Sequence, residues 1–254
     1  MNRILSLILL VVMLGATAVS SSADGCYRWF IKRNKGAAPG FPAEADNVSS
    51  LDGYYIDVNA AGRGEKVIYL TFDAGYENGN VERILDTLKE EGVQGAFFLL
   101  DNIILKNTEL VKRMAEEGHL VCNHTRNHKN LSSASAEEIK ENLESLERIY
   151  KEKTGREMDK YFRFPAGEYS LEAMKAIKEM GYKTVFWSFA YADWDNHRQP
   201  DSEMAMKLIL ENTHPGAVIL LHPTSNTNAD ILPRLIAEWR KMGYTFGTLD
   251  QLTV

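Results

Sequence analysis

Cysteine is scarce in this chain of 254 residues and occurs only at Cys26 and Cys122. Two cysteines cannot form the framework of several disulfides that stabilises many small secreted domains. The chain also lacks an excess of positive charge, because its formal net charge is −6. A nucleic-acid-binding domain usually carries a basic patch or stripe, so we expect no nucleic-acid partner.

Long apolar runs are also rare, and the clearest one covers residues 4–14. Arg3 precedes this run, and small residues up to Ala23 follow it, which predicts a signal peptide over 1–23. The run is shorter than the ~20 residues of a full membrane span. Two alternatives are an uncleaved membrane anchor and a lipoprotein modified at Cys26, although the residues before Cys26 match a lipoprotein site poorly. Each of the three readings places the remaining chain outside the cytoplasmic membrane.

The remaining sequence has the composition of a folded globular protein, with 44% hydrophobic and 25% charged residues. Residues 24–65 are rich in glycine, proline, asparagine and aromatic residues, and we interpret them as an N-terminal wrap and not a separate domain. Residues 66–254 carry the regular patterns of a single main domain, which we expect to hold the catalytic site.

Strand and helix patterns alternate in this main domain. Short apolar runs typical of buried strands occupy 67–72, 95–100, 119–123, 161–164, 184–189, 217–221 and 244–248. Helical spacing of apolar residues occupies 81–91, 107–117, 136–153, 171–180, 202–212 and 229–242. About seven strands alternating with helices predict a parallel α/β sheet, either open with both faces covered or closed into a barrel.

Polar side chains with catalytic potential follow five of these strands. They are Asp73, His124, Arg163, Asp193 and His222. The carboxyl ends of parallel strands meet at one end of such a fold, where α/β proteins bind their ligands. A single aspartate in this position is often a turn residue. Five polar residues of these types at five strand ends are hard to explain by turn chemistry, so we expect a catalytic site there.

His124 and His128 are four residues apart. One helical turn would place both imidazoles on the same side, at a spacing that suits a divalent metal. The alternative is two polar loop histidines, because Asn123, Asn127 and neighbouring residues are polar as well. The presence of other candidate residues on neighbouring strand ends favours the metal.

Five short motifs resemble those of the polysaccharide deacetylases, the carbohydrate esterases with a nodulation-protein-B-type homology domain. They are TFDAG at 71–75, HTRNH at 124–128, RFPAG at 163–167, DW at 193–194 and LH at 221–222. All five occur in the family's order over residues 66–252. The resemblance implies a distorted (β/α) barrel of about seven parallel strands and hydrolysis of an N-acetyl group on a sugar.

Residues 73–79 and the N-terminal wrap look most like the delta-lactam-biosynthetic deacetylases. These act on N-acetylmuramic acid in spore-cortex peptidoglycan. Two positions depart from the family pattern. Ala74 stands where the family has an aspartate metal ligand, and Ala190 stands where it has the first aspartate of D-x-x-D-W. We therefore expect a weakened metal site. The sequence leaves open which residue orients the catalytic histidine.

Amide hydrolysis needs an activated water and a proton for the departing amine. A divalent metal, with zinc the expected ion and other cations open, would bind His124 and His128 and activate water. Asp73 is the candidate general base and His222 the candidate general acid.

Arg163 would hold Asp73 ionised, or form a purely structural ion pair. Asp193 would orient either His222 or Arg163. A backbone N–H near Gly167 would contribute to an oxyanion hole.

Sugar rings stack on aromatic side chains, so a glycan groove needs exposed aromatic residues near the site. Trp194, Tyr169 and Tyr76 lie close to the motifs, and we expect them to contact substrate together with Gly167.

The expected partner is a glycan strand of peptidoglycan, bound by a monomer that is secreted or associated with the cell wall or spore. The alternatives are a weakened, carbohydrate-binding homologue, a deacetylase of another N-acetylated polysaccharide, and a glycosidase, which would need two facing carboxylates.

Overall fold

A computed structural model describes residues 25–253 of the chain. The predicted signal peptide over 1–23 lies outside the described residues. The strands of the main sheet are β2 (Gly53–Tyr54), β3 (Val67–Ala74), β4 (Ala96–Leu99), β5 (Leu120–Asn123), β6 (Asp159–Phe162), β8 (Lys183–Val185), β9 (Ala217–Leu221) and β10 (Thr245–Gly247). Their order is β10-β3-β4-β5-β6-β8-β2, and β9 also pairs with β3. Every pairing in this sheet is parallel, as the sequence predicts.

The sheet curls round toward closure beyond β8. Phe189 forms a parallel bridge with Ile219 of β9, so the two ends of the sheet approach each other. The predicted distorted barrel is confirmed, but the strand predicted over 184–189 is too long. It ends at Val185, and the Phe186 N–H makes the last bond of the β2–β8 ladder, to the carbonyl of Tyr54.

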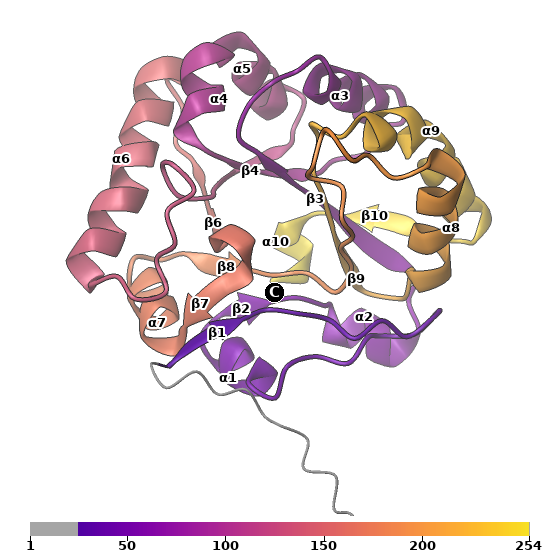
Figure 1. Cartoon of the computed structure of the whole chain (residues 1–254), viewed down its shortest axis with the longest axis horizontal. Coiled ribbons are helices and arrows are strands. Elements are labelled where there is room, and N and C mark those ends of the chain that lie inside the picture. The colour runs from indigo at the N-terminus through magenta and orange to yellow at the C-terminus, as the bar shows by residue number, and fades with distance from the viewer. Residues whose placement is uncertain (1–24, 254) are drawn as a thin grey trace, which may run out of the picture.

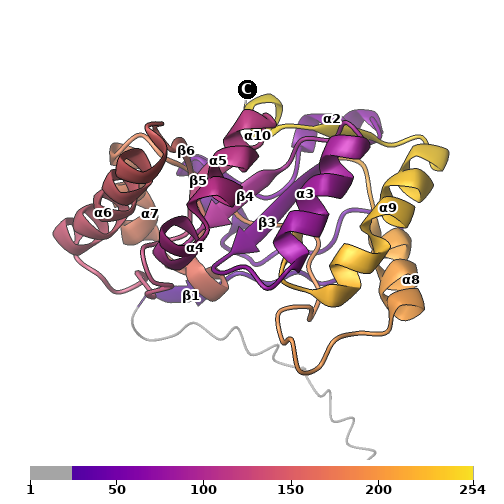
Figure 2. The same ribbon diagram turned by 90° about the horizontal axis from the view of Figure 1, so that it is seen from above.

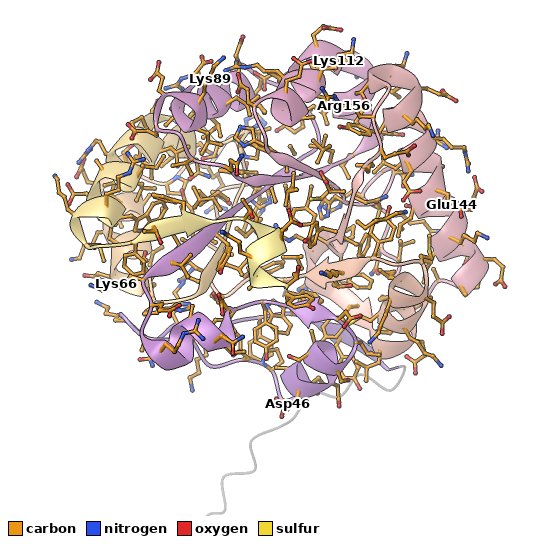
Figure 3. All side chains as sticks on the ribbon, turned by 180° about the vertical axis from the view of Figure 1, so that it is seen from behind. Asp46, Lys66, Lys89, Lys112, Glu144 and Arg156 are labelled. Carbon is orange, nitrogen blue, oxygen red and sulfur yellow. The ribbon has the colours of Figure 1, made fainter. Side chains whose placement is uncertain are left out.

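The long helices cover the outer face of the sheet (Figure 2). They are α3 (Asn80–Glu90), α5 (Thr108–Glu116), α6 (Ala136–Thr154), α7 (Leu171–Glu179), α8 (Ser202–Asn212) and α9 (Asn226–Lys241). The short helices α4 (Asp101–Lys106) and α10 (Leu249–Leu252) have no counterpart in the sequence prediction. Charged side chains labelled in Figure 3, among them Lys89, Lys112 and Glu144, lie on this outer surface.

Local capping explains where two helices begin. The Ser135 side chain and Glu138 form the predicted capping box at the start of α6. Helix α9 begins at Asn226, three residues before the predicted start, because the Ser225 hydroxyl accepts the N–H of Asn228. The early start places Asn228 in the first turn of α9, beside the site described below.

The N-terminal segment lies across the gap between β8 and β9 (Figure 1). It contains β1 (Cys26–Arg28), α1 (Ala45–Ser50), β2 and α2 (Val58–Arg63). Strand β1 pairs antiparallel with β7 (Glu168–Ser170) in a separate small sheet. Trp29 is 2% exposed, stacks on Phe186 with 4.6 Å between ring centroids, and donates from Nε1 to the Trp187 carbonyl. The segment is therefore anchored by aromatic packing.

Apolar side chains fill both faces of the strands. Leu70 and Phe72 of β3 belong to the cluster that also contains Ile84 and Leu88 of α3. The alternate residues Tyr69 of β3 and Phe98 of β4 belong to an inner cluster, together with the buried thiol of Cys122. This alternation leaves the strand ends as the place where polar side chains meet. Among residues 25–253, no helix is both long enough and apolar enough to cross a membrane.

Candidate active site

Polar residues gather at the carboxyl ends of the parallel strands, as the sequence predicts. Asp73 is the penultimate residue of β3, and His124, Arg163 and His222 each follow the last residue of β5, β6 and β9. Asp193 comes from the segment that leads away from the Phe189 bridge. Residues from five separate segments thus meet at one end of the sheet.

Arg163 is the fixed centre of this group. Its side chain is fully buried and lies over the ring of Phe98, with 4.2 Å between Cζ and the ring centroid. Its Nη1 donates to Asp73 Oδ1 at 2.8 Å, Nη2 donates to Thr71 Oγ1 at 2.9 Å, and Nε donates to the Val185 carbonyl at 2.9 Å. The guanidinium therefore holds one oxygen of Asp73 in place and leaves the other available.

The Asp73 carboxylate is kept ionised by its neighbours. Burial by itself would raise the pKa of Asp73, but the charges of Arg163, His124 and His222 together outweigh this and lower the pKa below its usual value. The side chain is 10% exposed, so it remains reachable from solvent.

His124 presents one ring nitrogen to Asp73. Its Nδ1 lies 2.8 Å from the Arg163 carbonyl, and its Nε2 lies 3.5 Å from Asp73 Oδ2. Burial lowers the pKa of His124 to about 4, so the ring is neutral at pH 7. Because a carbonyl only accepts, Nδ1 carries the proton and Nε2 keeps its lone pair. A neutral imidazole held in this way is the form that binds a metal ion.

His128 approaches His124 by a different route from the one predicted. Residues 124–130 form no helical turn. Instead, Thr125 and His128 have positive φ angles of 69° and 61°, and these left-handed residues turn the loop back. The two ring centroids lie 5.2 Å apart at an interplanar angle of 77°. His128 is exposed, whereas His124 is buried.

These two imidazoles are the candidate donors for a metal ion. Ala74 is fully buried in the same outer cluster as Leu70 and Phe72, and its methyl group cannot ligate. Within residues 25–253, no group of three or more His, Cys, Asp and Glu side chains is arranged to hold a metal. The residues fit a cation bound by two histidines and otherwise by water or substrate, one protein ligand short of the usual catalytic zinc site.

Asp193 is hydrogen-bonded to His222, one of the two partners that the sequence left open for it. His222 Nδ1 lies 2.7 Å from Asp193 Oδ1, and the His222 backbone N–H donates to Asp193 Oδ2 at 2.9 Å. Burial would lower the pKa of His222, but the Asp193 carboxylate more than reverses this and raises it. Ala190 therefore does not leave the histidine without a partner.

Asn228 joins the same group, although the sequence does not predict it. Its Nδ2 donates to Asp193 Oδ2 at 2.6 Å and to the His222 carbonyl at 3.0 Å. Its Oδ1 accepts the hydroxyl proton of Tyr191. The only signal in the sequence is the polar run 225–228 directly after the strand-end histidine, a run equally typical of a helix cap.

Two of the predicted aromatic residues are accessible near His222 and Asp73. Trp194 is 61% exposed, and its ring centroid lies 6.1 Å from that of His222. Tyr76 is 43% exposed, and its hydroxyl accepts a hydrogen bond from Asn196. Both rings are free to contact a ligand.

Tyr169 and Gly167 are not accessible, which contradicts their prediction as substrate contacts. Glu168 faces outward to Arg28, so strand alternation turns the Tyr169 ring into the core against Phe186, fully buried. Gly167 is buried beneath Trp187, and its N–H donates to Phe164. The next N–H, of Glu168, donates to Pro165. These two amides are used within the turn and not by an oxyanion.

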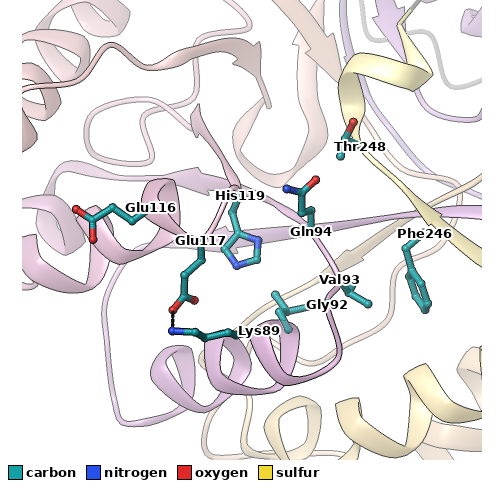
Figure 4. Close-up of a pocket in the computed structure, with 10 residues that line it drawn as sticks. Lys89, Gly92, Val93, Gln94, Glu116, Glu117, His119, Phe246 and Thr248 are labelled. Carbon is teal, nitrogen blue, oxygen red and sulfur yellow. Dashed lines mark ion pairs between the residues drawn. The ribbon is translucent and has the colours of Figure 1, made fainter.

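A cavity of about 500 Å³ lies at the opposite end of the strands. Figure 4 shows His119 between Glu117 and Gln94 on one side of it. His119 accepts the Gly95 N–H at Nδ1 and precedes β5, so it lies at the amino end of the strands. It is a buried residue at the start of this strand and is remote from the strand-end group.

Comparisons with known proteins identify related sequences and structures. The polysaccharide deacetylase family model matches residues 60–185. Peptidoglycan-N-acetylmuramic acid deacetylase PdaA of Bacillus subtilis is 37% identical over 239 residues, covering 94% of this chain and 90% of that protein. Its structure, described as a family 4 carbohydrate esterase, superposes with a TM-score of 0.84 at 35% identity, covering 91% of this chain and 98% of that one.

Two further solved structures are similar. A family 4 carbohydrate esterase from Bacillus anthracis has a TM-score of 0.73 at 34% identity, covering 91% of this chain and 98% of that one. A mutant with restored activity of a family 4 pseudoenzyme, also from Bacillus anthracis, has a TM-score of 0.68 at 27% identity and covers 74% of this chain and 68% of that one.

Proposed function

Because the chain belongs to the polysaccharide deacetylase family, we propose that it removes the acetyl group from N-acetylmuramic acid in peptidoglycan by hydrolysis of the amide bond. One observation carries this proposal. Asp73, paired with Arg163, and His222, paired with Asp193, lie close enough for the charge of each to shift the pKa of the other. An ionised base and a nearby histidine whose pKa is raised toward the protonated form are what hydrolysis of an amide needs.

Asp73 acts as the general base in this proposal. Arg163 occupies Oδ1 and leaves Oδ2 to accept a proton from the attacking water. The lowered pKa of Asp73 keeps the carboxylate ionised at neutral pH, although it also limits its basicity. The water must therefore be acidified by a further group.

His124 and His128 are the residues that would hold a divalent cation, with zinc the expected ion. A cation held there would supply a Lewis acid that polarises the acetyl carbonyl and lowers the pKa of water. The chain's own contribution is the lone pair of His124 Nε2, directed by the hydrogen bond of Nδ1 to Arg163. With Ala74 unable to ligate, we expect this cation to bind weakly.

His222 acts as the general acid for the sugar nitrogen. The Asp193 carboxylate accepts from Nδ1, so Nε2 is the nitrogen left to act on the substrate. The raised pKa of His222 favours the protonated ring, which can donate to the departing amine. Asp193 is a positioning residue in this step, and Arg163 is one for Asp73.

The glycan strand rests on exposed aromatic residues. Trp194, beside His222, provides a flat face for a sugar ring, and Tyr76 lies next to the Asp73 strand end. The similarity to PdaA supports peptidoglycan as the substrate and the cell wall as the place of action. We further propose a secreted or wall-associated monomer that acts toward muramic delta-lactam in the spore cortex.

Release of acetate is the direct test. The full mature chain is incubated with muramic-acid glycan strands that lack stem peptides, and separately with oligomers of N-acetylglucosamine. We expect acetate from the first substrate at a higher rate than from the second. Faster release from N-acetylglucosamine oligomers would show a deacetylase of another polysaccharide, and glycan binding without acetate would show the weakened, carbohydrate-binding homologue.

A glycosidase is disfavoured by the geometry of the carboxylates. Asp193 is 1% exposed and is surrounded by the donors of His222 and Asn228, so it does not face Asp73 across a sugar. New reducing ends in the same assay would contradict this conclusion.

A further inference from the structure

Asp193 is a buried carboxylate whose orientation decides where His222 points. Its two oxygens have different tasks: Oδ1 faces the His222 ring, and Oδ2 accepts from the His222 backbone N–H. Rotation about the last side-chain bond of Asp193 would exchange or lose these contacts. A carboxylate in this position needs a further donor that distinguishes Oδ2 from Oδ1.

Asn228 supplies that donor. Its Nδ2 lies 2.6 Å from Asp193 Oδ2 and 3.0 Å from the His222 carbonyl oxygen. Both neighbours only accept, so the amide nitrogen and not the amide oxygen must face them. Asn228 is 1% exposed, so water does not compete for these contacts. It also lies in the first turn of α9, whose N-terminal end favours a nearby negative charge.

Tyr191 fixes the other side of the Asn228 amide. Its hydroxyl lies against Asn228 Oδ1, which only accepts, so the hydroxyl donates. Tyr191 is 5% exposed and stands two residues before Asp193. A flipped Asn228 would point its oxygen at the Asp193 carboxylate and its amide at the Tyr191 hydroxyl, which would lose both contacts to Asp193 and His222.

We propose that Asn228, held by Tyr191, is a positioning residue that sets the orientation of Asp193 and through it of His222. This rests on the proposed function of His222 as general acid. Asn228 touches neither the substrate nor the reacting atoms. Its effect is exerted through Asp193, 35 residues earlier in the chain.

A double-mutant cycle separates this role from a general contribution to folding. Asn228→Ala should lower kcat about 10-fold with KM changed less than about 2-fold, because binding contacts are untouched. Tyr191→Phe removes only a hydroxyl and should lower kcat in the same direction by a smaller factor. In an Asp193→Asn background, Asn228→Ala should cause no further loss. Asn212→Ala is the matched control, since Asn212 is a buried asparagine that bonds to Leu208 of its own helix.

A proton NMR measurement tests the pairing without any substrate. The Nδ1 proton of His222, identified by its loss in His222→Gln, should give a far-downfield signal that shifts or disappears in Asn228→Ala and persists in Asn212→Ala. An unchanged signal in Asn228→Ala would overturn the positioning role. So would an equal loss of kcat in the wild-type and Asp193→Asn backgrounds. Absence of acetate release by the wild type would instead reject the proposed function, and the NMR signal would still decide the role of Asn228.

Discussion

Asp73 has two oxygens in different surroundings, and this difference is the basis of its proposed chemistry. One oxygen accepts from Arg163 at 2.8 Å, and the other faces Nε2 of His124 at 3.5 Å. An asparagine at this position keeps an acceptor for Arg163 but cannot take a proton from water. The substitution therefore tests chemistry with little change in packing.

Asp73→Asn should lower kcat by about 10²-fold or more, with a folded chain and a small change in KM. The measurement is acetate release over a range of glycan concentrations, with circular dichroism to check folding. Asp195→Asn is the control, because Asp195 is an exposed aspartate in the loop next to Trp194. Normal turnover by Asp73→Asn would reject its assignment as the base.

Asp193 should control the pH dependence of turnover through His222. The acid must be protonated to act, so activity falls as the pH rises through the pKa of His222. The Asp193 carboxylate raises that pKa. Asp193→Asn should therefore move the alkaline limb of the profile of kcat against pH to lower pH and lower its maximum. A limb that stays in place would show that another group titrates there.

Among the helices and strands, the N-terminal segment depends on one aromatic anchor. Trp29 stacks on Phe186 and lies 4.7 Å from the ring of Tyr55, whereas its neighbour Phe30 is 57% exposed. Trp29→Ala should lower the free energy of unfolding by about 3–5 kcal/mol, as for other buried aromatic side chains. Phe30→Ala should change it by less than about 0.5 kcal/mol. Urea unfolding followed by fluorescence and circular dichroism compares the two, and equal effects would contradict the anchor.

His119 links the starts of β4 and β5, since its ring accepts the Gly95 N–H. Burial lowers the pKa of His119 to about 4, below its usual value near 6.5. Above pH 6.5 the ring is neutral in the folded and unfolded chains alike. As the pH falls from 6.5 toward 4, only the unfolded chain gains the proton, so stability is lost in this window.

The loss attributable to His119 between pH 7 and pH 5 should be about 1–2 kcal/mol. The difference in unfolding free energy between these pH values should shrink by this amount in His119→Asn. It should stay as in the wild type in His197→Asn, where the histidine lies in an exposed loop. An unchanged pH dependence in His119→Asn would mean that the buried ring is already protonated or hydrated.

For the chain as a whole, net charge does not favour binding to an anionic polymer. With a formal net charge of −6, recognition of a glycan must rest on local contacts at the strand ends. Catalysis should likewise depend on a cation held by only two protein ligands.

Chelation should therefore abolish acetate release at modest chelator concentration, and added zinc should restore it. His128→Ala should raise the zinc concentration needed for half-maximal activity by about 10-fold or more, whereas Asn127→Ala in the same loop should not. The measurement is a zinc titration of the metal-free enzyme, together with calorimetry of zinc binding. Full activity in chelator would reject a metal-assisted mechanism.

The sequence alone determined which side chains meet at the site. Asp73, His124, Arg163, Asp193 and His222 each follow a buried run, and parallel strands place all such ends together. This inference needs only short-range pattern and the geometry of parallel sheets. It was therefore independent of how the surrounding segments pack.

Tertiary structure alone decided which neighbours those side chains have. Tyr169 lies two residues after the motif that begins at Arg163, yet the N-terminal segment covers its ring. Asn228 contacts Asp193 from helix α9, which begins three residues before its predicted start. These contacts join residues 35 to 140 positions apart. Local periodicity tells which side chains share a face, but the segment that covers that face is chosen by packing of the whole chain.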